Sequence, residues 1–162
     1  METSGKLRKS WCEKLADSKD MPKVVTIEGK MSLKWGSGTV CIPAPVEVDE
    51  VMRRVPAGRL VTVNQIRETL ARKHGATIGC PITTGIFISI SARAAEETVA
   101  EGGTDITPYW RTLKSGGELN EKYPGGVEAQ AMRLRQEGHV IETDRAGKPK
   151  RVKDFKLALV EI

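Results

Sequence analysis

The sequence lacks the features of membrane and secreted proteins. Its 162 residues include no apolar run of about 18 residues, the length that spans a bilayer as a helix. No short apolar segment follows a basic start, as it would in a secretory signal. We therefore expect an intracellular, cytoplasmic protein.

Cysteine is also scarce. The three cysteines, Cys12, Cys41 and Cys80, are odd in number and include no Cys-x-x-Cys pair. This argues against a disulfide framework and against a zinc site, so we expect reduced thiols that are partly buried. No metal or other cofactor is predicted.

The chain is short and basic. Its 162 residues are enough for one domain whose hydrophobic core needs no disulfide bonds or metal ions for stability, and no internal repeat is visible. The formal net charge is +5, the isoelectric point is near 9.2, and 29% of the residues are charged. A polyanionic partner is compatible with this balance, although many proteins without such a partner share it.

Residues 1–45 are predicted to form a small N-terminal extension packed on the main body. A short helix begins within 6–11 and carries Trp11, and its function is not readable from the sequence. The apolar runs 24–27 and 38–42 are bounded by glycines and prolines, which is typical of short strands.

Two helices are predicted next. Apolar residues recur at helical spacing over 48–55. Thr62 and Gln65 have the spacing of a capping box and open a helix over 62–74, for which Gly75 is a natural left-handed stop.

A third helix is predicted from Cys80-Pro81 to about Glu97, because proline suits the first turn of a helix. The alternation in 87–91 is equally compatible with a strand. The length of the segment and its lack of a break favour a helix. With the helix 62–74 it would form a helix-turn-helix, a weak signal because any helical bundle supplies one.

The remainder of the chain is predicted to contain a loop over 98–107, irregular structure over 108–122 and a helix over 125–137. The turn residues 144–149 between two short apolar segments indicate a β-hairpin. The predicted fold class is therefore mainly α: a winged-helix-like helix-turn-helix domain with a short β-hairpin wing and a small N-terminal extension. Its main domain would span 46–142, followed by a basic hairpin and tail over 143–162.

Four motifs occur in order along the second half of the chain, and they are Pro108-Tyr109-Trp110-Arg111, Lys114-Ser115-Gly116-Gly117, Tyr123-Pro124-Gly125-Gly126 and Glu137-Gly138-His139. Their order and spacing resemble the C-terminal half of the methylated-DNA–protein-cysteine methyltransferases. The resemblance covers roughly residues 46–142. It is to the alkyltransferase-like members in particular, which lack the reactive cysteine and recognise a damaged base without repairing it.

The resemblance implies that the catalytic pair has been replaced. The family carries its nucleophilic cysteine at the position of Tyr109 and its histidine base at the position of Trp110. A phenol with a pKa near 10 is a poor nucleophile at neutral pH, and an indole is not a base. We therefore expect no enzymatic activity, and a structural or helix-terminal role for Glu137. The known noncatalytic relatives have Trp at the cysteine position and keep the histidine, so this chain also departs from them.

The helix that begins at Pro81 carries the predicted recognition face. Gly85, Ser89, Ala92 and Arg93 share one side at about 100° per residue, with Ile82, Ile86 and Ile90 beside them and leading toward the core. Such a face either packs against another helix or approaches DNA closely. The resemblance favours DNA: it implies a helix in the minor groove, with Arg93 filling the space of an extruded nucleotide. Arg93 paired with Glu96 or Glu97 is the alternative.

The resemblance also implies a lesion pocket, in which aromatic rings stack on the extruded base. Its predicted residues are Pro108, Tyr109, Trp110, Arg111, Tyr123, Pro124 and Gly125. Pro124 stands where the family often has serine, and Val63 where it has a tyrosine that helps to rotate the phosphate of the lesion. The alternative is that these rings simply fill the core.

Further DNA contacts are predicted at Thr62 and Asn64 and at the basic hairpin residues Lys148, Lys150 and Arg151. The alternative for the hairpin is a solvated charged face. The expected partners are double-stranded DNA, with or without an alkylated base, and downstream repair proteins, with the protein a nucleoid-associated monomer.

Two rival functions remain open. Cys80, at a predicted helix N-terminus, would be the nucleophile of an active alkyltransferase. A winged-helix transcription regulator would instead read the major groove, where Arg, Asn or Gln is expected. The recognition helix offers only Thr83, Thr84, Ser89 and Ser91 for that purpose.

Overall fold

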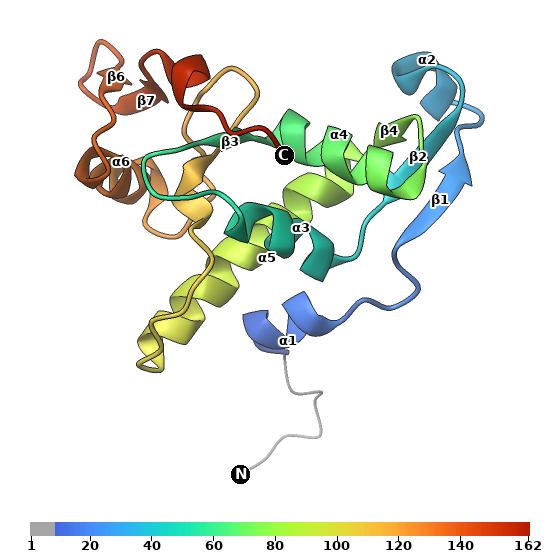
Figure 1. Ribbon diagram of the computed structural model, residues 1–162, viewed down its shortest axis with the longest axis horizontal. Helices are drawn as coiled ribbons and strands as arrows, with labels where there is room; N and C mark the ends of the chain where they lie inside the picture. The colour runs from blue at the N-terminus through green and yellow to red at the C-terminus, as the bar shows by residue number, and fades with distance from the viewer. Residues whose placement is uncertain (1–8) are drawn as a thin grey trace.

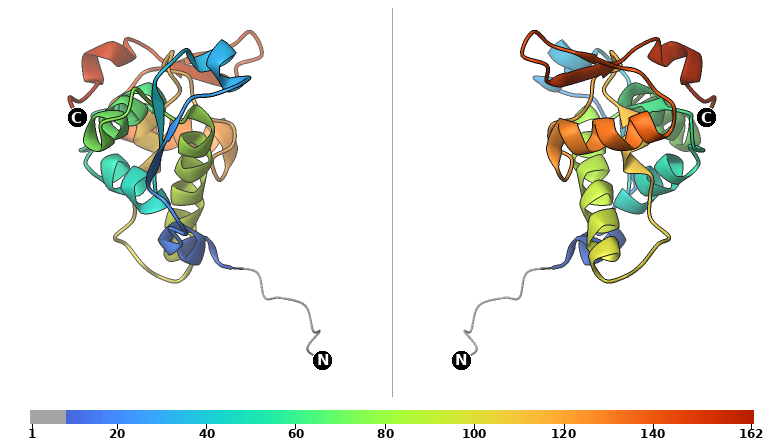
Figure 2. Two further views of the ribbon diagram at one scale, coloured as in Figure 1. Left: turned by 90° about the vertical axis from the view of Figure 1, so that its right-hand side faces the viewer. Right: turned by 90° about the vertical axis from the view of Figure 1, so that its left-hand side faces the viewer.

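The computed structural model describes residues 9–162, in which helices pack around the long helix α5 (Pro81–Ala100). Helix α3 (Pro45–Arg53) and helix α4 (Val63–His74) lie against α5, and α1 (Trp11–Ala16) packs against it near its C-terminal half (Figures 1 and 2). The main core is apolar and includes Met52, Leu70 and Ile88, each almost fully buried. The predicted helix start at residues 6–8 lies outside the described residues.

The capping signals of α4 are confirmed. The Thr62 hydroxyl accepts a hydrogen bond from the Gln65 N–H (3.3 Å), and the Gln65 side chain accepts one from the Thr62 N–H (2.9 Å). Gly75 ends the helix in the left-handed conformation at φ 65°. Six residues then lead to α5, which starts with Pro81 at its first position.

Helix α5 confirms the choice of helix over strand but is longer than predicted. It ends at Ala100, so the predicted loop 98–107 is wrong in its first three residues. Apolar residues lie around most of its circumference, and the prediction that Ile82 and Ile86 lead toward the core is also wrong. Their side chains are 62% and 51% exposed, because no neighbouring element within residues 9–162 covers that side of the helix.

The N-terminal extension contains the predicted strands β1 (Lys23–Thr26) and β2 (Thr39–Ile42), which pair antiparallel. The helix α2 (Met31–Trp35) between them was not predicted. Strand β4 (Ile78–Gly79) adds to the same sheet in parallel with β2. Gly79 is required there, because a Cβ would lie 2.5 Å from the Arg67 carbonyl oxygen. This sheet ties the extension to the connection between α4 and α5.

The segment after α5 contains a 3₁₀ helix, η1 (Tyr109–Arg111), followed by β5 (Thr112–Leu113). Strand β5 pairs in parallel with β3 (Val61–Thr62), which immediately precedes α4. Helix α6 (Gly126–Gln136) then closes this side of the core. The predicted helix 125–137 is confirmed to within one residue at each end.

The predicted hairpin is confirmed as β6 (Ile141–Thr143) paired antiparallel with β7 (Pro149–Val152). A second 3₁₀ helix, η2 (Phe155–Ala158), follows and was not predicted. The chain beyond it returns to the main body, where Leu60 exchanges backbone hydrogen bonds of 2.9 Å with Ala158 and Val160. The C-terminal tail is therefore packed on the fold.

Within residues 9–162, no helix is both long and apolar enough to cross a membrane. The same part of the chain contains no group of three or more His, Cys, Asp or Glu side chains placed to hold a metal ion.

Candidate functional site

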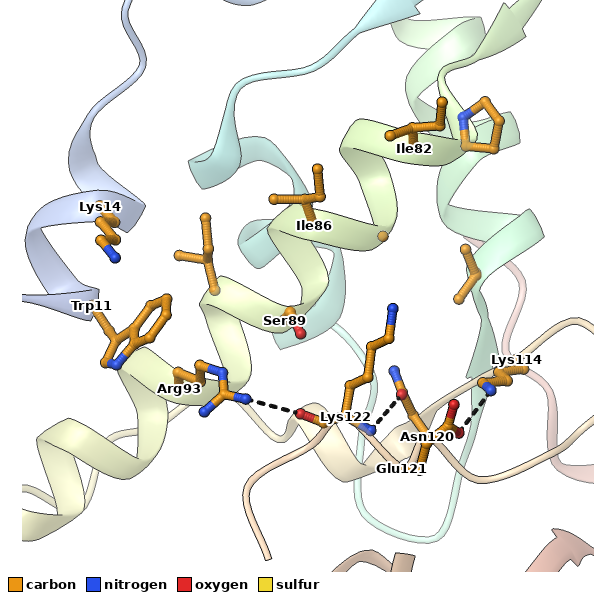
Figure 3. Close-up of a pocket in the computed structure, with 14 residues that line it drawn as sticks. Trp11, Lys14, Ile82, Ile86, Ser89, Arg93, Lys114, Asn120, Glu121 and Lys122 are labelled. Carbon is orange, nitrogen blue, oxygen red and sulfur yellow. Dashed lines mark hydrogen bonds and ion pairs between the residues drawn. The ribbon is translucent and has the colours of Figure 1, made fainter. Parts of the chain in front are cut away.

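The exposed face of α5 forms one wall of a groove with a cavity of about 790 Å³ (Figure 3). The opposite wall is the segment 114–122, and α1 lies beside one end. The residues that line this groove are Trp11, Lys14, Val63, Pro81, Ile82, Gly85, Ile86, Ser89, Ile90, Arg93, Lys114, Asn120, Glu121 and Lys122. The sequence predicted Gly85, Ser89 and Arg93 at this face, and the structure brings them together.

The groove face of α5 is smooth at its centre. Gly85 is exposed, and within the described chain no atom lies within 4 Å of the position a Cβ would take. Ala92 was predicted on this face, and that prediction is wrong: its side chain is 0% exposed and belongs to the core. Ala92 lies one turn after Ile88, and both side chains belong to the core. The 3₁₀ helix η1 also packs on α5.

Arg93 lies at the edge of the groove with its guanidinium loosely held. Its Nη2 donates to the Lys122 carbonyl oxygen at 3.4 Å, and its Cζ lies 5.3 Å from the centroid of the Trp11 ring. The alternative, in which Arg93 pairs with Glu96 or Glu97, is not observed. Glu96 accepts hydrogen bonds from Tyr109 and Arg133. Glu97 accepts from the backbone of α1.

The segment 114–122 is held in place from behind. The Asn120 N–H donates to the buried Gln130 of α6 at 2.8 Å, and the Asn120 side chain accepts from the Lys122 N–H at 3.0 Å. Lys114 pairs with Glu121 at 2.8 Å. Among residues 9–162, the cations Lys14, Arg93, Lys114 and Lys122 thus line the groove against one carboxylate, and the sequence analysis did not predict the lysines as contacts.

Tyr109, Trp110 and Tyr123 come together as predicted, but they are packed in the core. They are 3%, 8% and 3% exposed, and the Tyr109 ring meets those of Trp110 and Tyr123 edge to face at centroid distances of 5.4 and 5.1 Å. The predicted open pocket between these rings is therefore wrong for this structure, because the rings themselves fill the space.

Each ring also has a partner for its polar end. The Tyr109 hydroxyl donates to Glu96 at 2.6 Å, and the Tyr123 hydroxyl donates to the Thr112 carbonyl oxygen at 3.0 Å. Burial, joined for Tyr109 by the Glu96 carboxylate, raises the pKa of both phenols. Both hydroxyls therefore stay protonated at neutral pH, which leaves Tyr109 a poor nucleophile.

Glu137 has the structural role that the sequence predicted. It accepts from Trp110 Nε1 at 3.1 Å and from Arg111 Nη2 at 2.7 Å, and Arg111 donates onward to the Val55 carbonyl oxygen at 2.7 Å. Burial works to raise the pKa of Glu137, but the hydrogen bonds from Arg111, Trp110 and the Gly58 N–H outweigh it and lower that pKa. This carboxylate joins the end of α6 to η1 and to the loop after α3.

The other predicted pocket residues lie at the edges of the aromatic cluster. Pro108 is buried directly before η1, and Pro124 is half-buried. Gly125 precedes α6 at φ 80°, a left-handed conformation that favours glycine.

The cysteines are poorly placed for nucleophilic chemistry. Cys80 is 6% exposed and packs with Ile27 and Val40 in the small core beneath the sheet. Cys41 is fully buried, and burial raises the pKa of its thiol to about 11. Cys12 is exposed; a hydrogen bond with Thr98 works to lower its pKa, but burial and the Glu97 carboxylate raise it overall.

The predicted DNA contacts outside α5 are divided. Thr62 is 5% exposed and its hydroxyl caps α4, so its prediction as a contact is wrong: the residue was needed at the helix terminus. Asn64 is exposed but lines a separate cavity with Arg67 and Thr77. The structure thus places neither side chain in the groove.

The basic hairpin lies beside the groove segment. Lys148 and Lys150 are exposed, and Arg151 pairs with Glu142 at 3.2 Å. The Lys150 carbonyl oxygen accepts from the Leu119 N–H at 3.0 Å, so β7 is bonded to the chain that forms the groove wall. The hairpin is therefore attached to the segment that forms the groove wall.

No protein-family model and no curated protein sequence matches the chain. Two solved structures are similar to the chain. The chain is similar to S. pombe Atl1 in complex with damaged DNA containing O6-carboxymethylguanine, with a TM-score of 0.52 and 18% identity over 73% of this chain and 94% of that one. It is equally similar to an S. pombe ATL protein in complex with DNA, with a TM-score of 0.52, 19% identity and the same coverage. The chain has the fold of the alkyltransferase-like proteins.

Proposed function

We propose that the protein is a noncatalytic member of the alkyltransferase-like family that binds duplex DNA, recognises alkylated guanine and marks it for repair proteins. One observation carries the proposal. Gly85, Ser89 and Arg93 of α5 line an open, positively charged groove. The chain shares its fold with a protein whose structure was solved in complex with damaged DNA.

The chemistry of the groove fits a nucleic acid backbone. Gly85 and Ser89 let α5 approach closely, which suits the narrow minor groove better than long reading side chains do. Lys114 and Lys122 face the same space and would contact phosphates. Lys148 and Lys150 would extend these contacts as a wing.

Arg93 would fill the space of an extruded nucleotide. The alkylated oxygen of guanine faces the pairing partner, so it can be examined only when the base leaves the stack, at a cost of a few kcal/mol. Within residues 9–162 Arg93 is held by a hydrogen bond of 3.4 Å and a cation–π contact, and both are weak. The cation–π contact contributes about 0.5–1 kcal/mol, so DNA can displace it at little cost.

An extruded base would enter the groove cavity rather than the aromatic cluster. Opening the cluster would separate the Tyr109 and Tyr123 rings and break their buried hydrogen bonds. The groove already offers about 790 Å³, within the ~300–1,000 Å³ typical of small-molecule sites.

The absence of alkyl transfer is part of the proposal. Tyr109 is buried and its hydroxyl donates a hydrogen bond to Glu96, and two of the three thiols are buried. Incubation with duplex carrying a labelled O6-alkylguanine should leave the protein unlabelled. Stoichiometric label on a cysteine, mapped by peptide mass spectrometry, would favour the alkyltransferase alternative.

The central test is the affinity for matched duplexes with and without one O6-alkylguanine at fixed salt. Tighter binding of the damaged duplex is expected. Equal affinity would support a second candidate, a duplex-binding protein without lesion preference, which the closed aromatic cluster favours. Failure to bind either duplex would exclude both.

A further inference from the structure

Helix α1 is fixed on α5. Its own capping box joins Ser10 and Glu13 through hydrogen bonds of 2.9 and 3.1 Å. The Glu97 carboxylate of α5 accepts from the N–H groups of Trp11 and Cys12 at 3.0 and 3.1 Å. The Cys12 thiol donates to the Ala94 carbonyl oxygen at 3.6 Å. Because backbone and side-chain bonds both attach it, α1 is a wall of the groove and not a loose lid.

From this position α1 turns two side chains into the groove. Trp11 and Lys14 line the same cavity as Gly85, Ser89 and Arg93, and Figure 3 shows them at the end opposite Ile82. Lys14 Nζ lies 4.1 Å from the centroid of the Trp11 ring. Proteins that hold unpaired bases combine aromatic rings that stack on the bases with a positively charged groove that follows the phosphate backbone.

The groove continues past α1 instead of ending there. A second cavity of about 430 Å³ shares Lys14, Ile86 and Ile90 with the first. Its α1 side carries Lys9 and Lys19, with Lys9 paired to Asp17. Positive charge therefore follows the groove along α1, as a polyanion in the groove would require.

We propose that α1 is a second DNA-contacting element, in which the Trp11 ring stacks on a nucleobase of the bound duplex and Lys14 contacts a phosphate. This inference rests on the proposed function, since it takes DNA as the occupant of the groove. Arg93 leaves the ring of Trp11 when it enters the duplex, and the ring face it uncovers receives the base. The two residues then act together, and their effects on affinity are coupled.

The test measures binding of a labelled duplex and the tryptophan fluorescence of the protein. Trp11→Ala should lose about tenfold in affinity, within the range for one base–aromatic stack, whereas Trp11→Phe should keep most of it. DNA should quench the fluorescence of the parent protein. That quenching should disappear in Trp11→Phe and persist in Trp35→Phe, a control on α2 away from the groove.

A second measurement does not depend on how α1 tolerates the loss of the ring. Lys14→Gln should flatten the dependence of log affinity on log salt by about one unit. Parent affinity in Trp11→Ala with unchanged quenching in Trp11→Phe would overturn the inference. If Arg93→Ala weakens binding under those conditions, the proposed function survives alone; if the parent does not bind duplex, both fall.

Discussion

Enlarging the side chain at Gly85 should strengthen the fold and weaken DNA binding. Gly85 lies in the middle of α5, and within residues 9–162 nothing would contact a Cβ placed there. Glycine inside a helix costs about 0.8–1.0 kcal/mol relative to alanine, so Gly85→Ala should stabilise the protein by up to that amount. For a chain of this length this corresponds to about 2–4 °C in Tm.

The same position should be sensitive in the DNA complex. If the backbone of α5 approaches the duplex at Gly85, a leucine there occupies space that the complex needs. Overpacking of a close interface costs about 1–3 kcal/mol, or roughly 5- to 150-fold in Kd. Gly85→Leu should therefore show a raised Tm and a clearly weaker affinity, and the affinity of Gly85→Ala should lie between those of Gly85→Leu and the parent.

The assay combines thermal unfolding with anisotropy titrations of a labelled duplex at fixed salt. Ala100→Leu is the matched control, since Ala100 is an exposed position on the same helix outside the groove lining. It should leave affinity unchanged. If Gly85→Leu binds DNA as tightly as Ala100→Leu does, the close approach of α5 is refuted.

Three further outcomes are expected. Arg93→Ala should weaken binding and remove the fluorescence rise of a 2-aminopurine at the extruded position. Arg93→Lys should restore the affinity but not the fluorescence rise, because an ammonium is not planar and cannot stack; a rise equal to that of the parent would make Arg93 a phosphate contact. Replacing Lys148, Lys150 and Arg151 by alanine should weaken binding to all DNA sequences alike. The slope of log affinity against log salt should fall by about one unit per lost phosphate contact, and an unchanged slope would mean that the hairpin only faces water. Glu137→Gln should lower stability by about 3 kcal/mol at neutral pH. Because the folded pKa of Glu137 lies below its ordinary value, its contribution is present above that value and is lost as pH falls, so denaturant midpoints of the variant and parent should converge in acid.

Local signals in the sequence were sufficient for most of the elements. The capping pair Thr62 and Gln65, the stop at Gly75 and the hairpin turn each depend on neighbouring residues, and each is found where it was predicted. Strand β4 could not be predicted, because two residues form a strand only when a distant partner, here β2, lies beside them. The helix α2 was likewise too short to leave a periodic pattern.

The site was harder to predict because burial depends on what lies across from a helix face. Ile82 and Ile86 have the spacing of core residues, yet no neighbouring element in the described part of the chain covers them. Ala92 suited a small face, but its side chain is fully buried in the core. Periodicity gives the angle of a residue around its helix and not the neighbour at that angle.

The aromatic cluster and Glu137 form one hydrogen-bonded unit in the core. Glu137 accepts from the Trp110 indole and from Arg111, so this carboxylate has a structural role. Tyr109 and Trp110 occupy the space between α5 and α6 and hydrogen-bond at their polar ends. Because their packing is closed, the proposed function assigns recognition of a base to the groove along α5, where Arg93 makes one hydrogen bond of 3.4 Å. Specificity for a lesion would then depend on the groove and on the ease of extruding the damaged base, and not on a reactive centre.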